Sequence, residues 1–308
     1  MKKILALVLA LLVAIPAAGA YAESEPAKAV PMLTTASPQN NFIKVALSQE
    51  GYMEGPDGES IYSDWLGQYG HSWCSEFAAW SAYKAGIPED VIPRATSVRK
   101  FRDFFSAKGA FYIVEGGACN GCECSSFAAG TITIDEIKPG DIAFLEFDDN
   151  NATGDDHTAI VASVGEGLKN GYPFINTIEG NTTKTGDMYS SVGKRKRELV
   201  RIHGICRPDY YKVSYDQIGV VKPGLTKVIS KKTDTVKWKA VEGVEGYKVY
   251  RATSKKGTYK LVKTVKGAEK YKCSVTNAKH RKYYYKICTY NTYEGVKYRS
   301  AYSNILCR

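Results

Sequence analysis

Long apolar segments are absent from most of this 308-residue chain. No apolar run after residue 22 approaches the roughly 20 residues needed to cross a bilayer, which excludes a polytopic membrane protein. Histidine is scarce as well, with only 4 in the chain, so each can be weighed singly as a catalytic base. The hydrophobic content of 44% excludes a wholly disordered chain, and the length favours two domains over one.

The first 22 residues have the parts of a secretory signal peptide. Two lysines precede an apolar run, residues 4–15, and small residues follow up to Ala22. This pattern predicts cleavage after Ala22 and a secreted protein, in a compartment where disulfides are permitted. An uncleaved anchor is the alternative. No cysteine follows the apolar run, so we expect neither a lipid anchor nor a stable attachment to a membrane. Residues 23–41, rich in Pro, Ser and Thr, are predicted to form a flexible lead-in.

Charge is distributed unevenly along the chain. Residues 23–221 hold 18 Lys+Arg and 27 Asp+Glu, a net charge of −9, whereas residues 222–308 hold 22 and 5, a net charge of +17. This break lies beside Lys222-Pro223-Gly224 and predicts a domain boundary with a linker over residues 212–225. The overall charge of +10 alone would favour a nucleic-acid partner. Because we expect the chain to be exported, we predict no nucleic-acid partner.

A cysteine stands at the predicted start of a helix in the acidic part. From Trp73 to Gly86 apolar residues recur at helical spacing, and Gly86 is a typical helix stop. The dipole and the free N–H groups at a helix start favour a thiolate and can hold a developing oxyanion. Cys74 is therefore a candidate nucleophile. A disulfide or a buried structural thiol is the alternative.

A histidine and two polar residues follow on predicted strands. Residues 142–147 and 157–164 have strand patterns and predict a hairpin, with His157 at the start of its second strand as a candidate general base. A third strand pattern, residues 174–178, leads into Glu179-Gly180-Asn181. Period-two alternation predicts that Glu179 and Asn181 project to the same side, where either could orient the imidazole.

Several ordered motifs between residues 42 and 211 resemble one enzyme family. They are Trp73-Cys74-x-x-Phe77-x-x-Trp80, Pro139-Gly140-Asp141-Ile142, Asp156-His157-x-x-Ile160-Val161 and Ile178-Glu179-Gly180-Asn181-Thr182. This set resembles the CHAP domain, the cysteine, histidine-dependent amidohydrolase/peptidase of bacterial cell-wall hydrolases. The resemblance implies an α+β papain-like fold with an antiparallel sheet over residues 42–211.

The resemblance also implies roles for individual residues. Carried over by position, Cys74 is the nucleophile, His157 is the base, Glu179 orients the base, and Asn181 completes the polar set. A turn residue after Gly180 is the plain alternative for Asn181. Gln68 precedes Cys74 by six residues, the offset of the oxyanion-hole glutamine in papain-like enzymes, and is a weaker candidate.

The expected activity is hydrolysis of an amide bond in peptidoglycan. The motifs leave open whether the enzyme is an N-acetylmuramoyl-L-alanine amidase or an endopeptidase of the stem or cross-bridge peptide. One alternative is an exported papain-like protease that acts on proteins. Another is a non-catalytic wall-binding protein on the same scaffold. His71, in a Gly-rich loop near Cys74, is expected to be exposed without a role.

Seven further cysteines are expected to be structural, with disulfides favoured over zinc because the local sequence lacks a fourth ligand. In the acidic part Cys206 is a candidate partner for the Cys119-x-x-Cys122-x-Cys124 segment, whereas in the basic part Cys273 and Cys288 could bridge strands and leave Cys307 over. We expect no cofactor. The loop from Asp149 to Ile160 begins like a calcium loop but lacks the closing Glu. Asp57, Glu59 and Asp64 form another acidic group, and we expect both groups to be solvated loops and not calcium sites.

The basic part, residues 226–308, has short segments of alternating polarity separated by turns. This pattern predicts an antiparallel sandwich. The strings Gly246-Tyr247-x-Val249-Tyr250-Arg251 and Tyr283-Tyr284-Tyr285-Lys286-Ile287 resemble the fibronectin type III modules of exported bacterial enzymes. The positive charge of the basic part favours anionic wall polymers as a partner in addition to peptidoglycan itself. The alternative is a soluble spacer with a solvated lysine face.

Overall fold

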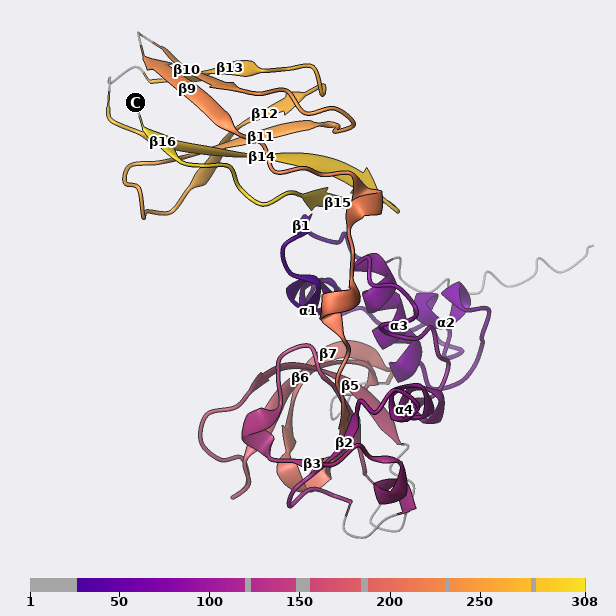
Figure 1. Cartoon of the computed structure of the whole chain (residues 1–308). Helices are drawn as coiled ribbons and strands as arrows, with labels where there is room; N and C mark the ends of the chain where they lie inside the picture. The colour runs from indigo at the N-terminus through magenta and orange to yellow at the C-terminus, as the bar shows by residue number, and fades with distance from the viewer. Residues whose placement is uncertain are drawn as a thin grey trace, which may run out of the picture.

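The computed structural model describes residues 27–119, 123–147, 156–183, 188–230, 233–277 and 281–307. The predicted signal peptide lies outside them. In the described residues the chain is mostly β-sheet with a few helices, which agrees with the predicted mixture of an α+β part and an all-β part (Figure 1). No helix among these residues is long and apolar enough to cross a membrane.

The acidic part consists of a helical layer on a seven-stranded sheet. The helices are α1 (Pro38–Ser48), α2 (Ile61–Trp65), α3 (Cys74–Lys84) and α4 (Val98–Ser106). The strands are β2 (Phe111–Val114), β3 (Thr131–Ile132), β4 (Ile142–Leu145), β5 (His157–Val164), β6 (Phe174–Thr182), β7 (Ser191–Glu198) and β8 (Ile202–Cys206). The sheet order is β3-β2-β8-β4-β5-β6-β7, antiparallel throughout except for the β2–β3 pair.

The predicted hairpin is confirmed, and it fixes the position of His157. Strands β4 and β5 pair antiparallel, with Leu145 opposite His157. Helix α3 packs against β5 and β6, and its residues from Cys74 to Ala82 are all buried. A helix that is buried on every side carries its first residue into the interior. Cys74 is therefore held against the sheet rather than presented on the surface.

The basic part is a sandwich of two sheets. One sheet has the order β13-β10-β9, and the other has the order β1-β15-β14-β11-β12 with β16 paired to β14. The strands are β1 (Leu33–Thr34), β9 (Leu225–Ser230), β10 (Thr233–Trp238), β11 (Gly246–Ala252), β12 (Lys260–Lys266), β13 (Lys272–Thr276), β14 (Tyr284–Tyr293), β15 (Val296–Arg299) and β16 (Leu306–Cys307). Buried Trp238, Tyr247 and Tyr285 fill the space between the sheets.

The expectation of a flexible lead-in over residues 23–41 is wrong for its second half. Leu33 and Thr34 form β1, which pairs in parallel with β15 of the sandwich, and Leu33 is fully buried. Helix α1 begins at Pro38, inside the expected lead-in, because Ser37 caps it by accepting from the Asn40 N–H. One apolar side chain and one cap thus order a stretch whose composition suggested a coil.

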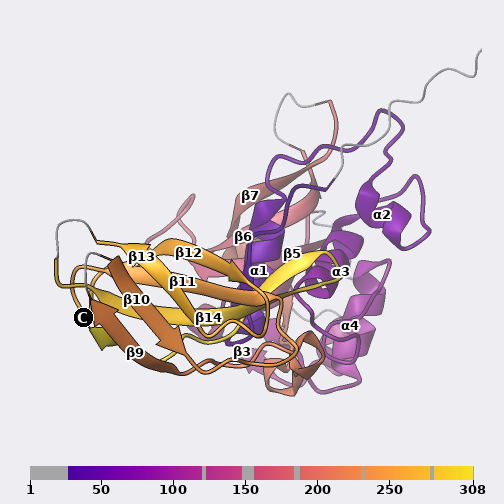
Figure 2. The ribbon, with the colours of Figure 1, turned by 90° about the horizontal axis from the view of Figure 1, so that it is seen from above.

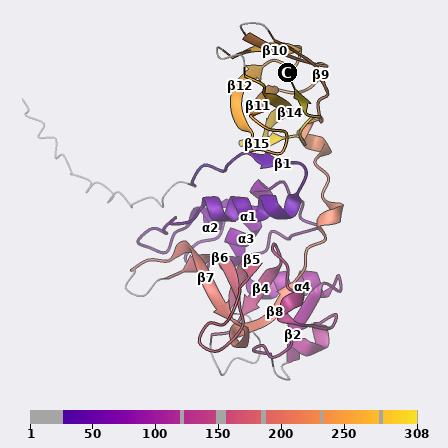
Figure 3. The ribbon, with the colours of Figure 1, turned by 90° about the vertical axis from the view of Figure 1, so that its left-hand side faces the viewer.

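The predicted linker, residues 212–225, is packed rather than loose. Tyr215 and Ile218 are buried, and the Tyr215 hydroxyl donates to the Ala85 carbonyl oxygen (2.9 Å) at the end of α3. The Tyr298 hydroxyl of β15 donates to the Lys84 carbonyl oxygen (2.7 Å). Helices α1 and α3 lie between the sandwich and the seven-stranded sheet (Figures 1 and 3). The two parts therefore share an apolar and hydrogen-bonded interface.

Two of the disulfides considered in the sequence are not formed: the one from Cys206 to the Cys119 segment and the one between Cys273 and Cys288. Cys206 is a buried free thiol on β8, so it does not bridge to the Cys119 segment. Cys119 is disulfide-bonded, and the side chains of Cys122 and Cys124 lie outside the described ones. Cys273 and Cys288 are also free thiols. Alternation explains this, because Ile287 points into the sandwich core and Cys288 therefore points to the opposite face, away from Cys273 at the core.

Candidate active site

The candidate nucleophile is the first residue of α3. Trp73 occupies the N-cap position without a side-chain hydrogen bond to the helix, so the first N–H groups of α3 are not capped by this residue. Trp73 is itself fixed, since it is fully buried and its indole N–H donates to Glu54 Oε2 (2.7 Å). The sequence thus places Cys74 at a rigid helix start with backbone donors beside its thiol.

His157 lies next to Cys74 in the buried interior. Burial raises the pKa of the Cys74 thiol, but the neighbouring His157 imidazole and a hydrogen bond with the Thr158 backbone outweigh it, and the pKa is lowered from its ordinary value. Burial lowers the pKa of His157, but Cys74 and then Glu179 raise it, to about 9. These opposite shifts favour a thiolate–imidazolium pair at neutral pH.

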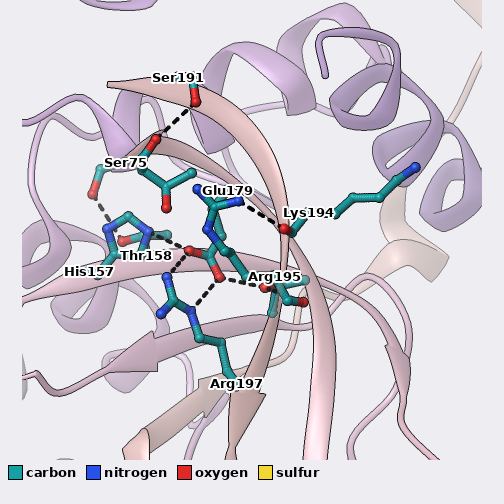
Figure 4. A network of polar contacts seen from close by, with 10 residues as sticks. Ser75, His157, Thr158, Glu179, Ser191, Lys194, Arg195 and Arg197 are labelled. Carbon is teal, nitrogen blue, oxygen red and sulfur yellow. Dashed lines mark hydrogen bonds and ion pairs between the residues drawn. The ribbon is translucent and has the colours of Figure 1, made fainter. Parts of the chain in front are cut away.

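Glu179 on β6 completes the pair from the far side of the imidazole. Its Oε2 lies 3.1 Å from His157 Nε2, which leaves Nδ1 for the thiol. Arg197 of β7 donates to both oxygens of Glu179, with Nε 2.8 Å from Oε1, and Thr177 donates to Oε1 (Figure 4). Burial raises the pKa of Glu179, but the hydrogen bonds from Arg197 and His157 lower it to about 2. Glu179 is therefore a fixed anion at any physiological pH.

Asn181 does not share this arrangement. A register shift interrupts the β6–β7 pairing between Glu179 and Thr182, and Asn181 adopts a left-handed backbone with φ of 53°. The alternation that placed Glu179 and Asn181 on one side is therefore broken by a bulge. Asn181 is half-buried, and it takes no part in the hydrogen bonds that join the described His157, Glu179 and Arg197 side chains. Gly180 is required here, because a Cβ would lie 2.5 Å from the Cβ of Phe77.

Gln68 is not brought into contact with Cys74. It is half-buried in the loop after α2, and its amide nitrogen donates to the adjacent Gly67 carbonyl oxygen (3.3 Å). No hydrogen bond between described residues links it to the thiol. The sequence offset alone suggested the oxyanion role, and the loop conformation does not support it.

A second histidine–acid pair lies beside the nucleophile and was missed in the sequence. His71 Nε2 is 2.7 Å from Glu76 Oε1, and Glu76 itself is fully buried on the first turn of α3. Burial raises the pKa of Glu76, and its Oε2 has no hydrogen-bond partner among the described residues. The charge of Glu76 raises the pKa of Cys74, in opposition to His157. His71 is exposed, as expected, and its ring also contacts the buried Glu76 carboxylate.

Arg197 was missed as well, because the lysines and arginines of β7 have the appearance of a solvated strand. The pairing of β7 with β6 is what sets Arg197 against Glu179. Phe147 covers this group from the outside, since its ring centroid lies 5.7 Å from that of His157 and 4.8 Å from the Arg197 guanidinium carbon. The described residues contain no group of three or more His, Cys, Asp or Glu that could hold a metal ion.

Comparison with known proteins adds little to this geometry. No protein-family model and no curated protein matches the chain. A solved Fn3-like protein from Clostridium thermocellum is 29% identical over 28% of this chain and 91% of that chain, with a TM-score of 0.23. A β-1,2-glucanase from Parabacteroides distasonis is 16% identical over 55% of this chain, with a TM-score of 0.26. The chain spans 25% of that glucanase, and at these TM-scores neither likeness supports an assignment.

Proposed function

We propose that the chain is a cysteine amidohydrolase or peptidase that acts on peptidoglycan, with a CHAP-type papain-like domain and a fibronectin type III-like module. The observation that carries the enzymatic part is the buried Cys74–His157–Glu179 series at the start of α3. The wall as substrate, and export of the chain, are supported by the sequence motifs and the N-terminal pattern.

The chemistry follows from the positions of these groups. The Cys74 thiolate attacks the amide carbonyl carbon, a C–S bond forms, and the carbonyl π electrons move to oxygen. Backbone N–H groups at the start of α3 are placed to hold that oxyanion. As the C–N bond breaks, the His157 imidazolium gives its proton to the leaving amine.

Hydrolysis of the acyl-enzyme uses the same groups. Water attacks the thioester while His157 accepts its proton, the C–S bond breaks, and the free acid leaves with the thiolate restored. Glu179 keeps the imidazole oriented and stabilises its charge in both half-reactions, because Arg197 and Thr177 hold the carboxylate in place. It acts as a fixed anion and takes no proton itself.

The test is digestion of purified cell walls by the wild-type chain and by Cys74→Ala. We expect the wild type to clear a wall suspension and the variant to lose at least about 1,000-fold in rate, since removing the nucleophile removes the covalent route. Cys206→Ala is the matched control, because Cys206 is likewise a buried free thiol but lies on β8. Mass spectrometry of the released muropeptides identifies the cleaved bond. Hydrolysis of casein in the absence of wall clearing would contradict the proposal and favour the protease alternative.

A further inference from the structure

The outer face of the larger sandwich sheet carries an ordered group of cations and tyrosines. On β14, Tyr285 and Ile287 are buried in the sandwich core, so alternation turns Lys286 to the opposite face. Tyr250 of β11 lies directly opposite Lys286 in the antiparallel register. Strands β9, β10 and β13 form the other layer, and in Figure 2, seen from above, β9 and β10 overlie the strands of this sheet.

The centre of this face is the Tyr302 cluster, formed by Tyr250, Tyr259, Lys286, Arg299 and Tyr302. Lys286 Nζ lies 3.7 Å from the ring centroid of Tyr302 and 4.4 Å from that of Tyr259. The Arg299 guanidinium carbon lies 4.3 Å from the Tyr302 centroid, and the Tyr250 ring meets Tyr302 edge-on at 5.2 Å. The rings thus hold two cations in place on a rigid sheet.

A second group of the same kind lies farther along β14. Lys248 and Lys297 place their ammonium groups 5.5 and 5.8 Å from the centroid of the Tyr290 ring. Lys248 belongs to β11 and Lys297 to β15, so the cations flank β14 on both sides. Together with the Tyr302 cluster they form a band of four cations across three adjacent strands.

Among the described residues, no carboxylate forms a salt bridge with the four cations of this band. Four of the five acids of the module have other partners: Asp234 bonds to Tyr285 and Asn277, Glu245 to the Thr292 N–H, Glu269 to Lys270 and Glu294 to Tyr83. The fifth, Glu242, forms no salt bridge to the band among the described residues. Burial and then the like charge of Arg299 lower the pKa of Lys286. Lys286 and Arg299 therefore share the Tyr302 ring without a salt-bridge partner in the described part of the chain, an arrangement that an external anion would relieve.

We propose that this band binds an anionic glycopolymer through its phosphate or carboxylate groups. The cations are already ordered by the rings, so less side-chain entropy is lost on binding than for free surface lysines. The faces of Tyr302 and Tyr290 are covered by cations and are not open for the base stacking that single-stranded nucleic acids use. Strands β11, β14 and β15, which carry the band, are neighbours within one sheet, so the band lies on no separate helix or two-stranded ribbon that could enter a duplex groove. The identity of the polymer, the one found in cell walls, rests on the proposed function.

Binding is tested with the full chain carrying Cys74→Ala, so that it does not depend on hydrolysis. The probe is insoluble Gram-positive wall, used intact and after hydrofluoric acid has removed its phosphodiester-linked polymers, with co-sedimentation measured over a salt series. We expect binding that weakens as salt rises. Loss of binding after extraction assigns the anion to phosphate, and binding that persists assigns it to wall carboxylates.

Matched double variants separate this band from net charge. Lys286→Gln with Arg299→Gln should weaken binding about 10-fold, which corresponds to two lost charge contacts of modest strength. Lys227→Gln with Lys237→Gln removes the same charge from β9 and β10, where these residues lie opposite each other in the other sheet, and should weaken binding less than about 2-fold. In a chain with Cys74 intact, unchanged hydrolysis of a soluble muropeptide would show that the first variant is folded.

Three outcomes would overturn this inference: equal loss in the two double variants, no loss in the first, or binding of duplex DNA as tight as binding of wall. The first would mean that net charge alone attracts the polymer. A chain that binds walls through the band yet never cleaves them would refute the proposed enzyme while leaving the band intact.

Discussion

Arg197 donates hydrogen bonds to both carboxylate oxygens of Glu179, and Glu179 in turn contacts Nε2 of His157. The three side chains form a series that leads from β7 through β6 to β5 and ends at the thiol of Cys74 on α3. Arg197 never reaches the reacting atoms, so it is a positioning residue. Burial alone would favour the neutral form of the Glu179 carboxyl group, and Arg197 keeps this group charged.

Replacement of Arg197 by Met should lower the rate of wall clearing by about 10- to 100-fold, the range typical of a lost orienting partner. Without the guanidinium the pKa of Glu179 rises from about 2, so activity should also fail at a higher pH on the acid side. Arg197→Lys keeps the positive charge but cannot donate to both oxygens of Glu179 in the same way, so its rate should lie between those of Arg197→Met and the wild type. Turbidity measurements over a pH series test both effects.

The control for this variant is Arg195→Met on the same strand. Arg195 donates to the Lys194 carbonyl oxygen (3.0 Å) and does not hold Glu179. An equal loss of rate and an equal acid shift in both variants would mean that β7 matters only for folding.

Glu179→Gln should narrow the pH range in which the thiolate–imidazolium pair exists. That pair forms above the pKa of Cys74 and below the pKa of His157, which is about 9. Glu179 helps to raise the pKa of His157, so its loss should move the alkaline limit of activity to lower pH. Turbidity measurements of wall clearing over an alkaline pH series report this limit. An unchanged profile would contradict the role of Glu179.

Glu76→Gln should have the opposite effect on Cys74. The charge of Glu76 raises the pKa of Cys74, so its removal should let the thiolate form at a lower pH and move down the acid limb of the pH profile for Cys74 alkylation by iodoacetamide. The exposed Glu115→Gln, which also removes one negative charge, should leave the profile in place. If both variants shift it equally, the effect comes from net charge and not from the first turn of α3.

Gly86→Ala should destabilise the interface between the two parts of the chain. Gly86 has φ of 70°, and an added Cβ would lie 3.0 Å from Tyr215 Cε1 and 3.1 Å from the Tyr298 hydroxyl. We expect a loss of about 2 to 4 kcal/mol in the free energy of unfolding, from backbone strain and overpacking together. Urea denaturation measures it.

Gly109→Ala separates those two contributions. Gly109 has a similar φ of 62°, but nothing lies within 4 Å of its added Cβ. The free energy of unfolding should therefore fall only by the contribution of backbone strain, about 1 kcal/mol. Equal losses at Gly86 and Gly109 would mean that the contact with Tyr215 and Tyr298 does not matter.

Local patterns were sufficient to find the elements that carry Cys74 and His157. Helical spacing with Gly86 as the stop predicted α3, and strand alternation predicted β4 and β5 as a hairpin, both of which the structure has. These features depend on near neighbours in the chain. The strand pattern failed at Asn181 because a bulge interrupts the alternation there, and this bulge depends on the fit of Gly180 against Phe77.

The sequence by itself determined the charge break, the helix that begins at Cys74 and the strand that begins at His157, since each follows from composition or short-range periodicity. Only the tertiary structure decided the rest. It set Arg197 against Glu179, placed Glu76 beside the thiol, buried Leu33 in a sheet with β15 and gathered Lys286 and Arg299 around Tyr302. Strand pairing and burial join residues far apart in the chain, and both the pKa of a buried group and the exposure of a charge depend on those distant neighbours.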